Sequence, residues 1–256
     1  MNEKTKRKKI RSYFSTSHPG IAVSFVLVGL IIVGFSVAAG RGAEPGIALG
    51  ALLLLLGLLW FFVAVSRQIK RPSDDQMDTW LAQDLKQIAE RSINKLGLVG
   101  IRLMKEGEPV MFTGPILWTT MGIPNRDLLW KKGKDDVVRF AVYRVTVIQL
   151  AEHLLGLYTC DFNFLKNVPL NESTDEYHYN DIASVGTREI STSYKLPSGK
   201  SLVHAQAFLL SIVSGDKVEV TIGAEKLQQL TGGTIPTTDA ESAIQVIRSM
   251  LREKKR

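Results

Sequence analysis

This chain of 256 residues contains one cysteine, Cys160, and only four histidines, which are scattered along the sequence. A single cysteine excludes an intrachain disulfide and any metal site built from several cysteines. The chain also lacks the phosphate-binding patterns G-x-x-x-x-G-K-[ST] and G-x-G-x-x-G, and its histidines match no zinc motif. We therefore predict a protein that is not an enzyme, with no catalytic residue, no cofactor, no metal and no small-molecule substrate.

Charge is absent from two long stretches near the N-terminus. Ile21–Ala39 and Ile47–Ser66 contain no Asp, Glu, Lys, Arg or His, and only residues 40–46 separate them. About 20 helical residues cross a hydrocarbon core of about 30 Å. The two stretches therefore predict a transmembrane helical hairpin over residues 20–66, with the lipid bilayer as its surroundings.

Basic residues flank both stretches on their outer sides, whereas the short loop between them offers only Arg41 beside Glu44. An excess of Lys and Arg marks the cytoplasmic side of a membrane. We predict an integral protein of a bacterial inner (plasma) membrane, with both termini in the cytoplasm. The charges that define this topology are Lys4, Lys6, Arg7, Lys8, Lys9 and Arg11 before the hairpin and Arg67, Lys70 and Arg71 after it.

The net charge of +7 does not indicate a nucleic-acid-binding protein once it is divided along the chain. Residues 1–71 hold 10 basic and 2 acidic residues, whereas residues 72–256 hold 22 basic and 23 acidic residues. The excess positive charge therefore lies next to the predicted hairpin, where it favours anionic lipid headgroups. Nucleic acid is not an expected partner.

Small residues at helical spacing lie within both predicted spans. They are Gly34 and Ala38 in the first span, and Gly46, Gly50 and Gly57 in the second. Small residues let helix backbones approach closely in lipid. They predict packing of the two spans against each other, and homo-oligomerisation through the same faces is the alternative.

Outside the predicted hairpin, the chain divides into three segments. Residues 1–19 are a basic cytoplasmic segment, residues 67–97 a juxtamembrane linker and helix, and residues 98–256 a cytoplasmic domain. Ser73 is a candidate N-cap, and Met77, Leu81, Leu85 and Ile88 repeat every three to four residues after it. This amphipathic helix could lie on the membrane, but its polar face is more acidic than basic. We prefer packing on the following domain or self-association.

Strand and turn patterns run from Val99 to Gly223. β-branched and aromatic residues are dense in Val137–Leu150 and Leu154–Phe164, whereas Asn171–Tyr177 has the composition of a polar, acidic loop. About seven strands are followed by an amphipathic C-terminal helix. The chain should therefore combine a membrane α-helical hairpin with an α+β cytoplasmic domain.

Residues 137–255 resemble the bacterial PH-like (pleckstrin-homology-like) family. The resemblance rests on the strand entry Tyr179–Val185, the hairpin Phe208–Ile222 around Ser214-Gly215-Asp216, and the closing helix Ala240–Arg252. It implies a partly open β-barrel capped by a C-terminal helix. It also implies a recognition or assembly module.

One loop is a candidate contact for lipid headgroups or an anionic ligand. It combines two tryptophans with three lysines, a mixture that suits a membrane interface. The simpler interpretation is a solvated lysine turn with both tryptophans packed on the domain. The residues are Trp118, Trp130, Lys131, Lys132 and Lys134.

We therefore predict a membrane-anchored, non-enzymatic scaffold whose cytoplasmic domain binds a protein partner or further copies of itself at the inner membrane face. The alternative is an oligomeric membrane effector, in which the hairpin forms or gates a pore in response to a cytoplasmic trigger.

Overall fold

A computed structural model describes residues 1–15, 19–40, 44–69, 71–100, 109–195, 201–215, 217–223, 231–235 and 240–254. The chain divides into two compact units. The hairpin unit is Arg11–Ser73, and the sheet unit consists of Met1–Ile10 together with Asp74–Arg256. The sheet unit is therefore built from both sides of the hairpin unit in the sequence.

Most of the hairpin unit consists of α2 (Pro19–Ala39) and α3 (Glu44–Ile69), which pack against each other. One stretch of helix, Pro45–Val63 in α3, is long and apolar enough to span a membrane, and only 11% of its most apolar window is buried. The apolar stretch of α2, Val23–Ala38, is shorter. Among the residues of this unit that the structure describes, one helix is thus a candidate membrane span by length and composition.

The two helices of the hairpin unit are antiparallel. Near their middle, a Cβ added to Gly50 would lie 3.0 Å from the carbonyl oxygen of Gly29. Towards the connecting loop, a Cβ on Gly46 would lie 3.1 Å from the Cβ of Ser36. At the open end, the Arg71 guanidinium donates to the carbonyl oxygen of Ser15 at 2.7 Å.

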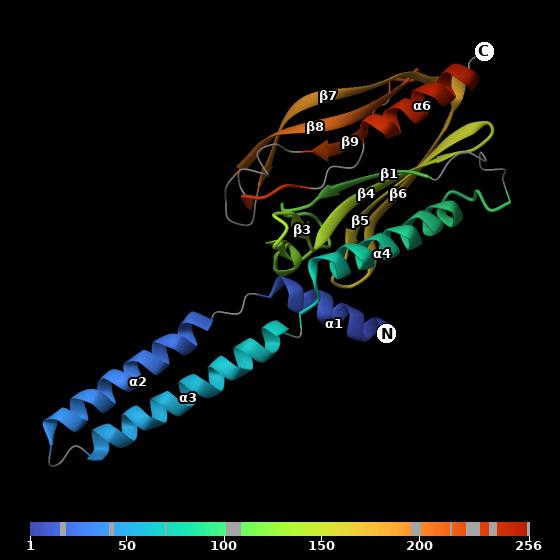
Figure 1. Ribbon diagram of the computed structural model, residues 1–256. Helices are drawn as coiled ribbons and strands as arrows, with labels where there is room; N and C mark the ends of the chain where they lie inside the picture. The colour runs from blue at the N-terminus through green and yellow to red at the C-terminus, as the bar shows by residue number, and fades with distance from the viewer. Residues whose placement is uncertain are drawn as a thin grey trace. The chain divides into compact units, whose positions relative to one another are not determined.

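The sheet unit is built on two antiparallel sheets (Figure 1). Four strands form the first sheet in the order β1-β4-β5-β6, and three form the second in the order β7-β8-β9. A small ribbon of β2 and β3 stands beside them. The strands are β1 (Val110–Pro115), β2 (Trp130–Lys132), β3 (Val138–Phe140), β4 (Val142–Leu150), β5 (Leu154–Asn163), β6 (Val168–His178), β7 (Ile182–Lys195), β8 (Ser201–Ile212) and β9 (Lys217–Gly223), with 3₁₀ turns η1 (Asn125–Asp127) and η2 (Tyr179–Asp181).

The main core lies between the two sheets. Phe112 of β1 stacks on Phe208 of β8 with their ring centroids 5.0 Å apart. Helix α6 (Ala240–Lys254) adds Ile244 and Ile247 to this core and packs on β1 and β7 (Figure 1). The sheets form no closed barrel over the described strands.

Helix α4 (Asp74–Lys95) covers the other face of the four-stranded sheet by packing on β4. Side chains alternate along a strand, so Ile148 enters the main core while Gln149 points to α4. The Gln149 amide donates to Ser92 Oγ at 2.9 Å. The predicted packing of this helix on the domain is confirmed. Helix α4 belongs to the sheet unit, whereas residues 67–73 belong to the hairpin unit.

One element differs from the sequence-based expectation, and another was not predicted. The predicted acidic loop Asn171–Tyr177 is wrong, because these residues lie in β6, which pairs with β5 along its length. The basic N-terminal segment contains a helix, α1 (Glu3–Phe14). The expected strand Val99–Met104 lies mostly outside the described residues, as does Asp216 of the predicted hairpin turn.

Candidate functional site

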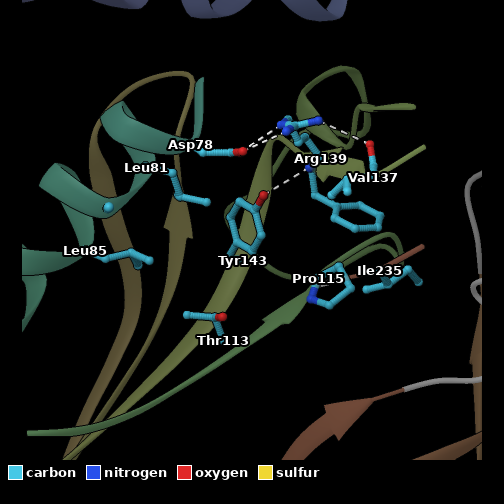
Figure 2. Close-up of a pocket in the computed structure, with 11 residues that line it drawn as sticks. Asp78, Leu81, Leu85, Thr113, Pro115, Val137, Arg139, Tyr143 and Ile235 are labelled. Carbon is cyan, nitrogen blue, oxygen red and sulfur yellow. Dashed lines mark hydrogen bonds and ion pairs between the residues drawn. The ribbon is translucent and has the colours of Figure 1, made fainter. Parts of the chain in front are cut away.

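A groove opens between α4 and the edge of the four-stranded sheet (Figure 2). Its volume of about 370 Å³ lies in the range of ligand-binding pockets. Apolar residues of helix α4 form one wall of the groove. Residues of β1, β3 and β4 form the opposite wall. The lining residues are Asp78, Leu81, Ala82, Leu85, Thr113, Pro115, Val137, Arg139, Phe140, Tyr143 and Ile235.

A buried arginine forms the polar end of the groove. Arg139 is only 4% exposed, and its guanidinium donates to both carboxylate oxygens of Asp78 at 2.7 and 2.6 Å. It also donates to both oxygens of Asp135 at 3.0 and 2.7 Å, and this lowers the pKa of Asp135 to about 2. Because Asp78 is on α4 and Arg139 is on β3, these ion pairs fasten the helix to the ribbon at one end of the groove.

Tyr143 forms part of the groove wall beside this cluster. Its phenol oxygen accepts a hydrogen bond from the Phe140 backbone N–H at 3.1 Å, and burial raises its pKa to about 12. Tyr143 is therefore a neutral, fixed phenol at physiological pH. It presents an aromatic ring to the groove instead of a charge.

The groove is suited to binding apolar groups. The charged side chains in its lining are Asp78 and Arg139, which form an ion pair with each other. Within the described residues, no group of three or more His, Cys, Asp and Glu side chains could hold a metal ion. Cys160 lies in β5 away from the groove lining, and burial raises its thiol pKa to about 12, so this sulfur is a poor nucleophile.

A second cluster fastens α1 to α4. Asp84 of α4 is fully buried, and it accepts bonds from Lys6 Nζ at 2.6 Å and from the Arg7 guanidinium at 2.5 Å. Arg7 also donates to the carbonyl oxygen of Phe164 at 3.0 Å, and its guanidinium carbon lies 5.8 Å from the centroid of that ring. The start of the chain is thus an integral part of the sheet unit.

A third cluster holds the C-terminal end of α4 to β6. Arg91 forms a bidentate pair with Glu172, with both bonds at 2.8 Å, and Tyr158 donates to the same carboxylate at 2.8 Å. The hydrogen bond from Arg91 lowers the pKa of Glu172 to about 2. Helix α4, which forms one wall of the groove, is therefore held by ion pairs near both of its ends.

The residues predicted to contact headgroups are brought together in part. Trp130, Lys131 and Lys132 form β2, Lys134 lies in the turn after it, and Trp118 follows β1. Lys132 pairs with Asp136 at 2.7 Å, and the Lys134 backbone N–H donates to Asp74 at 2.8 Å. Four carboxylates accompany the four cations of this region, which therefore has no excess positive charge. They are Asp74, Asp78, Asp135 and Asp136 beside Lys131, Lys132, Lys134 and Arg139.

The small residues of the predicted spans fall into two groups. Gly46 and Gly50 lie at the contact between α2 and α3, and Gly57 is also buried. Gly34 and Ala38 are exposed, and a Cβ on Gly34 would meet no atom within 4 Å. In α2, Gly29 and Ser36 lie at the contact with α3 instead. They are seven residues apart, which is two helical turns, so a search for small residues spaced by four does not find them.

The basic residues predicted to define the membrane topology differ in their surroundings. Lys6 and Arg7 are held by Asp84, whereas Lys4, Lys8 and Arg11 are exposed and Lys9 is half-buried. Arg71 bonds to Ser15 at the open end of the hairpin unit. Arg67 lies in α3, and Lys70 falls outside the described residues.

Comparison with known proteins provides no relative for this chain. No family model, no curated protein and no solved structure matches it.

Proposed function

We propose that this chain is an integral membrane protein of a bacterial inner membrane, in which α2 and α3 cross the bilayer as a hairpin and both chain ends lie in the cytoplasm. The main support is that Met1–Ile10 and Asp74–Arg256 form one compact unit, joined by the buried Lys6–Asp84 pair. A chain that leaves and re-enters one unit on the same side of a membrane crosses it an even number of times. If α3 crosses, α2 crosses as well.

The surface of the hairpin unit supports a lipid environment. Large apolar side chains are exposed along both helices, with Phe35 at 76% and Leu55 at 67%. Soluble monomeric proteins rarely expose contiguous apolar patches of this extent. A core helix of a soluble protein would be mostly buried, unlike the candidate span of α3. The cytoplasmic assignment follows from the basic residues at the open end of the hairpin unit, which include Arg11 and Arg71.

In this proposal the sheet unit is a non-enzymatic binding module that acts at the membrane surface. A PH-like identity agrees with the arrangement of four antiparallel strands, then three, then a C-terminal helix. The groove beside α4 is the best candidate for the site that receives a protein partner or a second copy. It has an apolar wall and a rigid frame, because ion pairs fix α4 on either side of it.

Leu85→Arg tests the groove as the binding site. Leu85 lines the groove from α4 and is half-buried. A guanidinium there would fill apolar space and would be desolvated by any bound partner, which costs several kcal/mol. We expect a second chain, identical or different, to copurify with the native protein in mild detergent and to be lost in Leu85→Arg, as measured by native mass spectrometry.

The matched control is Gln83→Arg, which adds the same side chain to an exposed position of α4 outside the groove. It should retain the second chain. A native protein that is strictly monomeric and free of partners would contradict the binding-module proposal. Equal retention by Leu85→Arg and Gln83→Arg would exclude the groove as the site.

A further inference from the structure

Helix α1 has two charged faces with different surroundings. Lys6 is 8% exposed and Ile10 is fully buried, and both face the interior of the sheet unit. Lys4, Lys8 and Arg11 follow one another at spacings of four and three residues, which places them on a single helical face. All three are exposed, and within the described residues no hydrogen bond or ion pair holds their side-chain charges. We call these three residues the outer stripe.

We propose that the outer stripe binds the anionic headgroups of the bilayer that surrounds the hairpin unit. This inference rests on the proposed membrane hairpin and adds the residues and the lipid chemistry that hold the sheet unit at the surface. Lys6 and Arg7 do not take part, because both are committed to the fully buried Asp84. The six basic residues before α2 are therefore not equivalent.

Position in the chain supports an anionic lipid as the partner. Phe14, the last residue of α1, precedes the first residue of α2 by only five positions, so the outer stripe stays close to the point where the chain enters the apolar hairpin. A Lys or Arg near an anionic bilayer strengthens binding by about five-fold. The buried bonds of Asp84 connect α1 to α4, so a lipid contact on the outer stripe restrains the whole sheet unit.

The test uses the full chain in lipid nanodiscs. A fluorophore is attached at Thr5→Cys, an exposed position of α1, after Cys160→Ser has removed the native thiol. Quenching by lipids that carry a spin label on the headgroup is compared in phosphatidylcholine alone and with about 30% phosphatidylglycerol. We expect quenching to increase with phosphatidylglycerol and to decrease in about 0.5 M NaCl, because salt screens exposed charges.

The variant K4Q/K8Q/R11Q should lose this dependence, corresponding to a loss of roughly a hundred-fold in preference for the anionic lipid. The charge-preserving variant K4R/K8R/R11K should keep it. The control K86Q/R188Q/K217Q removes three exposed charges of the sheet unit that are not part of α1, and it should behave as the native chain. The inference would be overturned if quenching did not depend on phosphatidylglycerol, or if the control variant lost this dependence as much as K4Q/K8Q/R11Q does.

Carbonate washing of native membranes, combined with the quenching measurement, separates this inference from the proposed function. If carbonate washing releases the chain from native membranes, the hairpin does not cross the bilayer and the proposed function fails. If the chain stays embedded but its quenching is independent of lipid charge, only the assignment of the outer stripe fails.

Discussion

Asp84→Ala should cause the largest loss of stability of any single substitution in the sheet unit. Asp84 is fully buried and holds both Lys6 and Arg7, so its removal leaves Lys6, at 10% side-chain exposure, without a carboxylate. It leaves Arg7, at 11%, with only Glu3 of its own helix turn as an acidic partner. Breaking a buried ion pair in this way costs about 3–5 kcal/mol. We expect the melting temperature, followed by tryptophan fluorescence of the full chain in detergent, to fall by roughly 10 °C.

Two variants separate the loss of charge pairing from the loss of packing. Asp175→Ala removes an exposed carboxylate of β6 and should change the melting temperature by less than about 2 °C. The triple variant K6M/R7M/D84L removes all three charges and should recover most of the stability, because apolar side chains of similar size often replace buried ion groups without cost. A native melting temperature in Asp84→Ala would show that α1 is not fastened through this carboxylate.

Gly50→Leu should force the two helices of the hairpin unit apart. A Cβ at Gly50 would lie 2.6 Å from a methyl group of Val33 and 3.0 Å from the Gly29 carbonyl oxygen, which belongs to the backbone and cannot rotate away. Overpacking of this kind costs about 1–3 kcal/mol. The readout is the disulfide yield of a cysteine pair at Ser36 and Gly46, whose Cβ positions are 3.1 Å apart, close to the range of a disulfide.

We expect efficient oxidation of this pair in the Cys160→Ser background and a several-fold lower yield once Gly50→Leu is added. Gly34→Leu is the matched control, because a Cβ at Gly34 would meet no atom within 4 Å. It should leave the yield unchanged. A larger effect of Gly34→Leu than of Gly50→Leu would contradict the observed helix contact and would favour a contact between copies through the Gly34 and Ala38 face.

The elements with a strong local signal could be predicted from the sequence. The repeat of Met77, Ile88 and their neighbours identified α4, because burial on one helical face gives a period of 3.6 residues. The C-terminal helix was equally clear, since Ile244 and Ile247 mark its buried face. The pairing of β8 and β9 was visible from two apolar strands on either side of Gly215, which has a φ of +98°.

Elements whose role depends on distant residues could not be predicted. β6 is an exposed strand at the edge of its sheet, and its many polar residues give it the composition of a loop. Its strand conformation follows from its pairing with β5, which its own residues do not reveal. Asp84 lies in a helix with other acidic residues, and nothing local distinguishes it from exposed Asp78. Its partners lie 77 and 78 residues earlier in the chain.

The groove could not be predicted from the sequence either, because it too depends on contacts between distant residues. Its apolar wall uses Leu81 and Leu85, which belong to the stripe that predicted packing on the domain. Whether such residues contact the sheet directly or line an open space depends on how α4 is tilted. Ion pairs set that position, and the acceptor of one pair is Asp78, which binds an arginine 61 residues later.

The most direct test of the membrane hairpin is the accessibility of single cysteines in intact bacterial cells. The native thiol is replaced by Cys160→Ser, and a cysteine is introduced at Ala43 between the two helices, at Thr5 in α1 or at Ser249 in α6. With a membrane-impermeant maleimide, only Ala43→Cys should be labelled in intact cells, whereas Thr5→Cys and Ser249→Cys should be labelled only after permeabilisation. Labelling of Thr5→Cys and Ser249→Cys from opposite sides of the membrane, or protection of Ala43→Cys together with both, would contradict the account.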